Sequence, residues 1–400
     1  MIRQLLQGGS YPIGVDLSAA GVKLIQLRKA GAGFAVVAAA RADFDDETAH
    51  LPFSERLEKI TETLQRRVEG ARFTTRKCVV GVEDALLRAR SMRLPRMSRS
   101  EADRALRLEA PERLGFSEST PGEIGWLRAG EVRQGDDLRD ELIVVGALQS
   151  DMERLVDAVA AAGLRPVAVE PAFLACGRCY SRTYRRESDD GAVRLIIDIG
   201  FDRSGIIVLR GSDVVFFKSY ESGGDALNRI AAQQLGMEVG TVAELRRRGA
   251  SDEQNNEGRD ARVDRAIFEA IRPLLGEIVD EAARCLRYYS VTFRGERPDY
   301  VLLTGAEAHE PGLSTLARDA LNVPVRVGKP LEGIDLATAK GTLERRGEQA
   351  DWSAAVGLSL RGDPNMVQAA REARIGRRRE DAAAARSAAQ SAPRSRREAA

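Results

Sequence analysis

Histidine and cysteine are scarce in this chain, which has two histidines and four cysteines among 400 residues. His50 and His309 stand in unrelated contexts, which argues against a His-based triad or His-based acid–base catalysis and leaves carboxylate chemistry open. Cys176 and Cys179 have the spacing of a metal or redox pair. A zinc site needs two more ligands and no second pair exists, so we interpret the thiols as structural or incidental.

Long apolar runs and an excess of one charge are also missing. No stretch reaches the ~18 uncharged apolar residues of a membrane span, and the first residues form too short an apolar run for a signal peptide. Charged residues make up 30% of the chain but leave a net charge of +1, so no global field recruits nucleic acid or anionic membrane. We expect a cytoplasmic protein with no specific nucleic-acid partner.

Two distant segments share one design. Residues 13–18 and 195–200 are apolar runs ending in an aspartate and a small residue, and each precedes a second apolar run. In such a hairpin, small residues let backbone N–H groups approach phosphate oxygens, and the carboxylate can hold a metal ion's water shell. Taken singly, Asp16 or Asp198 is a common turn cap. One hairpin at the start of each half predicts a duplicated fold that clamps a nucleotide between two lobes.

The periodicity around the first hairpin predicts an α/β unit. Residues 11–82 have the order βββαβ, with an amphipathic helix over 54–69. Residues 86–169 have the order βαββαβ, which we interpret as an inserted subdomain. It includes a capping box at Ser98 and Glu101, and we expect a solvated hairpin loop over 128–139.

Three further segments suit a nucleotide. Gly223 and Gly224 open a helix after the second hairpin, where backbone N–H groups favour an anion. Gly305 ends a buried strand, and a glycine there allows a flat ring to lie against the backbone. Glu244 and Arg247 share a helix face, where a carboxylate can accept from ribose hydroxyls and a guanidinium can stack on a base. The alternative for this charged pair is a solvated helix face.

Taken together, these motifs resemble the PilM branch of the actin-like ATPase superfamily, close to FtsA. The hairpins are similar to the two phosphate motifs, and residues 302–313 are similar to the adenosine motif. Residues 161–171 and 352–361 also resemble PilM sequences at the same relative positions. The resemblance covers residues 11–361 and rests on the order of the motifs.

The resemblance implies an α/β, actin-like (ribonuclease H-like) duplicated two-lobe fold with an inserted FtsA-type 1C subdomain. The implied divisions are an N-terminal segment 1–10, subdomain 1A over 11–84, the 1C-like insert over 85–170, a return helix and linker over 171–192, subdomain 2A over 193–222, subdomain 2B over 223–296, the rest of 2A over 297–361, and a disordered basic tail over 362–400.

ATP and Mg²⁺ are the cofactors that the resemblance implies. Asp16 and Asp198 would face the metal through water. The residues placed at the phosphates are Ser18, Ala19, Lys23 and Gly200. Those placed at ribose and base are Gly223, Gly224, Glu244, Arg247, Gly305 and Ala306. Lys23 alternates with apolar neighbours, so a solvent-facing role is its alternative. Ser18, residues 201–203 and Ala306 depart from the family pattern and add bulk or charge beside the nucleotide.

By resemblance, the protein is a cytoplasmic scaffold of the type IV pilus assembly machine and at most a weak ATPase. Its implied partner is the cytoplasmic N-terminal peptide of a PilN-like inner-membrane protein, bound near the first lobe and the insert. Other pilus assembly proteins are candidate partners, and membrane contact is indirect. The alternatives are an FtsA-like division protein, a type II secretion adaptor, a sugar- or acetate-type kinase, and a nucleotide-free pseudo-ATPase.

Overall fold

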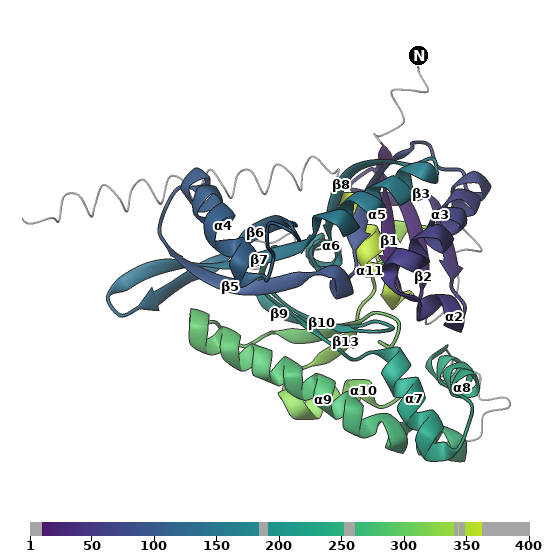
Figure 1. Ribbon diagram of the computed structural model, residues 1–400. Coiled ribbons are helices and arrows are strands. Elements are labelled where there is room, and N and C mark those ends of the chain that lie inside the picture. Colours follow the sequence, from purple (N-terminus) through teal and green to yellow (C-terminus); the bar gives the residue numbers. More distant parts are fainter. Residues whose placement is uncertain (1–9, 184–190, 252–260, 340–342, 344–348, 362–400) are drawn as a thin grey trace, which may run out of the picture.

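The computed structural model describes residues 10–183, 191–251, 261–339, 343 and 349–361. Two α/β lobes lie one above the other in Figure 1, and a three-stranded insert extends beside them. The predicted basic tail falls outside the described residues. Within the described part of the chain, none of the helices combines the length and apolar character needed to cross a bilayer.

A mixed sheet in the order β14-β3-β2-β1-β4-β8 forms the first lobe. Strands β1, β2 and β3 are consecutive and antiparallel, whereas β4 lies parallel to β1 and β8 parallel to β4. The strands are β1 (Ser10–Ser18), β2 (Gly21–Ala30), β3 (Gly33–Asp43), β4 (Lys77–Val82), β8 (Arg165–Pro171) and β14 (Ile334–Asp335).

The second lobe repeats this connectivity in the order β11-β10-β9-β12-β13. Three antiparallel strands come first, and β12 and β13 then add in parallel. The strands are β9 (Val193–Ile199), β10 (Ser204–Arg210), β11 (Asp213–Tyr220), β12 (Tyr300–Thr304) and β13 (Val325–Val327). The same strand order in both lobes confirms the predicted duplication. It also puts the turn after β1 and the turn after β9 at equivalent edges of their sheets.

Unbroken apolar runs explain the central strands. Leu195, Ile196 and Ile197 are fully buried in consecutive positions, as expected for a strand covered on both faces. Burying each such side chain contributes about 1.5–3 kcal/mol. The covering helices of the second lobe are α7 (Gly224–Leu235), α8 (Val239–Ser251), α9 (Ala261–Phe293) and α10 (Leu313–Leu321).

Helices of the first lobe include one contributed by the far end of the described chain. Helix α11 (Ser353–Leu360) packs against β1 and α6 (Ala172–Ser181) and returns the chain to the first lobe. The other first-lobe helices are α2 (Asp46–Ala49), α3 (Phe53–Gly70), α5 (Gln149–Ala161) and the short 3₁₀ segments η1 (Asp84–Leu86) and η3 (Ala350–Trp352).

The insert is a three-stranded antiparallel sheet with one helix. Its elements are β5 (Arg88–Pro95), α4 (Arg99–Arg113), β6 (Gly122–Gln134) and β7 (Asp137–Leu148). The capping box at Ser98 and Glu101 is confirmed. The predicted solvated loop over 128–139 is wrong, because both strands run on to a short turn at Gly135. Ala129 and Val132 are buried, which gives that stretch one apolar face.

The sheet topology corrects two predicted boundaries. Strand β8, expected at the end of the insert over 85–170, pairs with β4 in the first-lobe sheet, and α5 packs on α3. Residues 334–335 and α11, expected in the second lobe within 297–361, join the first lobe. Periodicity marks elements and says nothing of the sheet that each one joins, so these boundaries follow from pairing alone.

Candidate functional site

The turns of the two hairpins face each other across a cavity of about 150 Å³. The first hairpin contributes Asp16 and Ser18, and the second contributes Asp198 and Gly200. Each turn follows a buried central strand of its own sheet, β1 or β9, so the duplication brings the two together. The site therefore lies between the lobes.

Opposite charges are paired at the first hairpin. Lys23 Nζ lies 3.3 Å from Asp351 Oδ2 and 3.7 Å from Asp16 Oδ2, and Arg41 Nη1 lies 2.8 Å from Asp351 Oδ2. Burial opposes the charge on Lys23, but the carboxylates of Asp351 and Asp16 outweigh it and raise its pKa. Burial raises the pKa of Asp16, although Lys23 opposes that shift. Lys23 thus points into the cleft, engaged by carboxylates.

Carboxyl groups dominate the opposite side of the cavity. Burial, with the nearby charge of Asp16, raises the pKa of Asp198 to about 7. Burial, with the nearby charge of Asp198, raises the pKa of Asp84 to about 8. Oδ1 of Asp84 and Oδ1 of Asp351 are buried with no hydrogen-bond partner among the described residues. Buried carboxylate oxygens without donors are ligands that suit a hard cation such as Mg²⁺, so the donor set fits that ion.

Some of the predicted site residues line this cavity and others do not. Those that line it are Asp16, Ser18, Lys23, Asp198, Gly200, Gly305 and Ala306. Those that do not are Ala19, Gly223, Gly224, Glu244 and Arg247. The cavity therefore covers the predicted phosphate and metal end and stops at the start of the predicted adenosine segment.

Sequence reasoning missed five charged residues of the cavity, namely Arg41, Asp43, Glu83, Asp84 and Asp351. A signal for the pair Glu83 and Asp84 was present, because they follow a buried strand parallel to β1 and parallel strands end at one sheet edge. Arg41 and Asp351 carried no such signal, since they lie 310 positions apart in the chain.

Backbone donors at the glycines are already used in this arrangement. The N–H of Gly200 donates to the carbonyl of Arg203 at 2.9 Å, and that of Gly224 donates to the carbonyl of Gly200 at 2.9 Å. The N–H of Gly305 donates to the carbonyl of Ala350 at 3.3 Å. These three donors do not face an anion in the described conformation.

A buried ion-pair network occupies the space beside Gly224. Arg246 donates through Nη2 to Glu307 Oε2 at 2.5 Å and to Glu310 Oε2 at 2.8 Å, and through Nη1 to Asn228 Oδ1 at 2.5 Å. A Cβ on Gly224 would overlap the carboxylate of Glu307. The buried cation of α8 is thus Arg246. Arg247 and Glu244 are exposed, and Glu244 pairs with Arg248.

The four cysteines are free and buried, in agreement with structural thiols. Cys176 and Cys179 lie on α6, and burial raises the pKa of Cys179 to about 11. A thiol held protonated in the core is a poor metal ligand and nucleophile.

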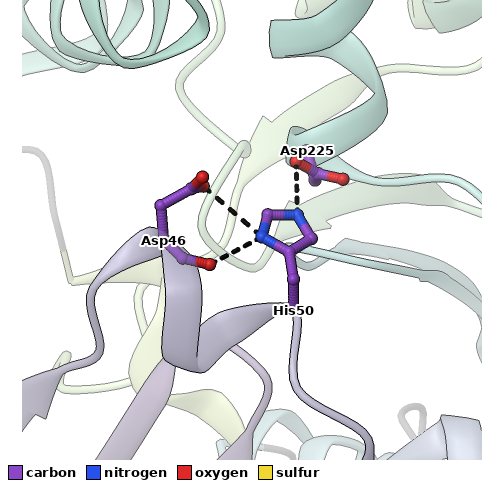
Figure 2. Close-up of side chains that lie close together, drawn as sticks. All are labelled: Asp46, His50 and Asp225. Atoms are coloured by element: carbon purple, nitrogen blue, oxygen red, sulfur yellow. Dashed lines mark hydrogen bonds and ion pairs between the residues drawn. The ribbon is translucent and has the colours of Figure 1, made fainter.

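A contact between the two lobes (Figure 2) lies beside Phe201, which lines the cavity. His50 follows α2 of the first lobe, and its Nε2 lies 3.1 Å from Oδ1 of Asp225 on α7 of the second lobe. The His50 ring also meets Phe201, of the second hairpin turn, edge-on with centroids 5.7 Å apart. The backbone carbonyl of Asp46, with the Asp225 and Asp46 carboxylates, raises the pKa of His50.

Comparison with known proteins agrees with this architecture. The chain is similar to a chain of a PilM–PilN type IV pilus biogenesis complex, with 21% identity, a TM-score of 0.72 and coverage of 88% of this chain and 98% of that one. It is also similar to ethanolamine utilization protein EutJ from Carboxydothermus hydrogenoformans, with 14% identity, a TM-score of 0.51 and coverage of 90% and 94%.

These similarities and the repeated sheet topology confirm the predicted actin-like, duplicated two-lobe α/β fold. The family model for type IV pilus assembly protein PilM matches residues 14–363, which is most of the chain. The chain belongs to the family of the type IV pilus assembly protein PilM.

Proposed function

We propose that this protein is a cytoplasmic scaffold of the type IV pilus machine that binds the cytoplasmic N-terminal peptide of a PilN-like inner-membrane protein. Family membership supports the pilus role. Similarity to a chain of a PilM–PilN complex, over 98% of that chain, is the observation that carries the partner. Association with the inner membrane then follows through the partner. Direct contact with lipid is not required.

We propose further that the cleft between the lobes binds a magnesium nucleotide, with ATP as the first candidate. The carboxylates of Asp16 and Asp198 would hold the hydrated Mg²⁺, and the unpartnered oxygen of Asp84 offers a third acceptor. When bound, Mg²⁺ neutralises phosphate charge and lets phosphate approach these acidic walls. Lys23 and Ser18 on the first hairpin would contact phosphate oxygens.

Nucleotide entry requires the cleft to open. The cavity of about 150 Å³ is smaller than the roughly 300–1,000 Å³ of typical ligand pockets. A ligand that binds the open and closed arrangements unequally shifts their populations by its differential affinity. Because the insert contacts both lobes, lobe movement would reshape the groove beside the insert and couple nucleotide to peptide affinity. This role needs binding and no rapid turnover, so we expect hydrolysis to be weak.

The test is calorimetric titration of the full chain with a synthetic PilN-type N-terminal peptide, with and without Mg·ATP. Wild-type protein should bind the peptide and bind Mg·ATP, and the two affinities should depend on each other. Asp198→Asn should keep the peptide and lose most of the nucleotide affinity, whereas the surface change Glu118→Gln should alter neither.

Three results separate the parts of the proposal. If the folded protein does not bind the peptide, the proposed PilN-type partner is ruled out. If the peptide affinity is equal with and without bound ATP, the proposed coupling between nucleotide and peptide binding is ruled out. Peptide binding without any ATP binding would favour the nucleotide-free pseudo-ATPase, a reading for which the Arg246 network beside Gly224 is the specific observation.

A further inference from the structure

The contacts of His50 are satisfied together only by a doubly protonated ring. His50 Nδ1 lies 2.6 Å from the backbone carbonyl oxygen of Asp46, and Nε2 lies 3.1 Å from Oδ1 of Asp225, as Figure 2 shows. Both partners are hydrogen-bond acceptors, and a neutral imidazole has one hydrogen to donate. Whichever nitrogen carries that hydrogen, the lone pair of the other faces an oxygen atom. The imidazolium form, with a hydrogen on each nitrogen, avoids this conflict.

The carboxylate of Asp225 is stabilised as an anion by its own helix. Asp225 lies in the first turn of α7, where the helix macrodipole favours a negative charge. Its Oδ2 accepts from Nε of Arg229 at 2.8 Å, one turn further along the same helix. These supports do not depend on His50. The protonation state of His50 therefore decides whether the two side chains attract each other.

The two nitrogens of the ring meet different lobes. Asp46 belongs to α2, which directly precedes His50, so the Nδ1 bond stays within the first lobe however the lobes move. Asp225 belongs to the second lobe, as does Phe201, whose ring meets the imidazole edge-on with centroids 5.7 Å apart. Separation of the lobes would break these second-lobe contacts and keep the bond to Asp46. Because the carboxylate of Asp225 favours the imidazolium, protonation and closure stabilise each other.

We propose that His50 is a pH-sensitive switch of lobe closure: the imidazolium joins the first lobe to Asp225 of the second lobe, and the neutral ring releases it. The charged groups facing the ring are Asp46, Asp225 and, behind Asp225, Arg229. The backbone carbonyl of Asp46, with the carboxylates of Asp225 and Asp46, raises the pKa of His50. The part due to Asp225 is lost when the lobes separate. Closure is therefore favoured below the pKa that His50 has in the separated arrangement, and this advantage is lost as the pH rises through the higher pKa of the closed one.

NMR titration of the full chain, labelled in histidine and free of nucleotide, tests the contact itself. The signal of His50 is identified as the one that disappears in His50→Gln. The pKa of His50 should be lower in Asp225→Asn than in wild type, because the amide carries no charge to stabilise the imidazolium. The titration midpoint of His309 should agree in the two proteins. An unchanged pKa of His50 in Asp225→Asn would overturn the proposal, since the second lobe would then not favour the protonated ring.

Energy transfer between dyes on the two lobes measures closure. Gln65→Cys on α3 and Gln233→Cys on α7 supply exposed attachment points, and the four native thiols are buried. Between pH 5.5 and pH 8.5, the ratio of closed to open protein should fall about 2- to 5-fold more in wild type than in His50→Gln, which is the effect of one exposed ion pair. Asp84 and Asp198 lose protons in the same range, so the difference between the two proteins is the diagnostic quantity.

The matched control is His309→Gln, which removes the only other histidine of the sequence. Its energy transfer should respond to pH as that of wild type does. Equal pH responses of wild type and His50→Gln would overturn the proposal, because closure would then not depend on the proton of His50. A response that His309→Gln abolishes as fully as His50→Gln does would overturn it as well.

Discussion

Carboxyl groups at the cleft differ in how they are balanced. Asp16 and Asp351 both pair with Lys23, and Arg41 pairs with Asp351, whereas Asp84 lies near Asp198, has one oxygen without a hydrogen-bond partner among the described residues, and is only partly balanced by the charge of Arg203. A buried carboxyl group without a cation favours the protonated form, because burial penalises the charge. Asp84 of the first lobe and Asp198 of the second lobe therefore destabilise the folded state as they lose their protons, because each raises the free energy of the other's charged form.

The unfavourable free energy of ionising these buried groups predicts that the stability of the protein depends on pH. Asp84 has a pKa of about 8 in the fold against 3.8 for the free residue, so between these values the folded state holds a proton that the unfolded chain has lost. The free energy of unfolding therefore falls as pH rises through this window. Asp84→Asn removes that dependence. We expect the stability difference to move in favour of the variant by roughly 1–3 kcal/mol between pH 5 and pH 8.

Urea denaturation at pH 5, 6.5 and 8 measures the stability difference between Asp84→Asn and wild type, with Glu118→Gln as the exposed control. A variant that loses stability relative to wild type as the pH rises would show that the ionised Asp84 has a stabilising partner. The remaining slope of the variant should come partly from Asp198, whose pKa of about 7 is raised by the same burial.

Individual site residues were predictable where backbone position fixes them. Asp16 and Asp198 end strands whose apolar pattern is plain, and both lie in the cleft. Glu244 and Arg247 were chosen by spacing on a helix, which does not fix the face that packs. Arg246, one position away, is the buried residue because the carboxylates of Glu307 and Glu310 come from a distant strand end.

Helix α11 shows what governs packing at the scale of elements. It crosses α6 and β1 so closely that glycines are required at the crossings. A Cβ on Gly357 would overlap the backbone carbonyl of Ala175, and one on Gly14 would overlap that of Ala355. Arg178 donates from α6 to the carbonyl of Gly357 at 2.9 Å and fixes the same crossing. The close approach places η3, and with it Asp351, beside Lys23.

We expect Gly357→Ala to destabilise the protein by about 3 kcal/mol, because the backbone of Ala175 leaves no room for a methyl group. The matched control is Gly276→Ala in α9, where no atom lies within 4 Å of the added methyl. That change should be neutral or stabilising by up to about 1 kcal/mol, since alanine is the better helix former. Urea midpoints of the two variants compare them, and equal midpoints would contradict the close packing of α11.

Elements with one strong period were predictable, and the ends of the insert hairpin were not. Helix α3 matches its predicted range to within one residue at each end, because Ile60, Leu64 and Val68 form a buried stripe. The stretch 128–139 resembles a loop because six of its residues are charged, few residues of β6 are buried, and β7 begins with exposed and half-buried residues. Long hairpins that extend past a core keep polar outer faces, which composition alone does not distinguish from loops.

At the scale of the molecule, the two hairpins made the duplication predictable from the sequence, but the position of the insert became clear only from the structure. Its strands pack on the second lobe as well as on their own helix. Ala129, Ile143 and Val145 belong to the apolar core that also contains β9 and β10. Gly130 lies against Phe293 at the end of α9. Because the insert is connected to the first lobe and packs on the second, a change in the relative position of the lobes would change its contacts.

One polar contact between insert and second lobe is a candidate for carrying that coupling. Tyr288 of α9 donates its hydroxyl hydrogen to Glu141 Oε1 of β7 at 2.9 Å, and Arg93 of β5 binds the other oxygen at 2.6 Å. A hydrogen bond to a charged group contributes about 1.5–3 kcal/mol. If lobe closure displaces α9, this bond transmits the displacement to the sheet of the insert.

Tyr288→Phe should therefore lower the ratio of peptide affinities measured with and without Mg·ATP, by at least about 2-fold, while peptide affinity without nucleotide stays near wild type. Tyr300→Phe is the matched control, because Tyr300 also loses a bond to a charged group, the 2.9 Å contact from Arg194, but within the second lobe alone. Its ratio should not change. An unchanged ratio in Tyr288→Phe, or an equal fall in both variants, would mean that apolar packing of the insert, and not this bond, conveys the state of the cleft.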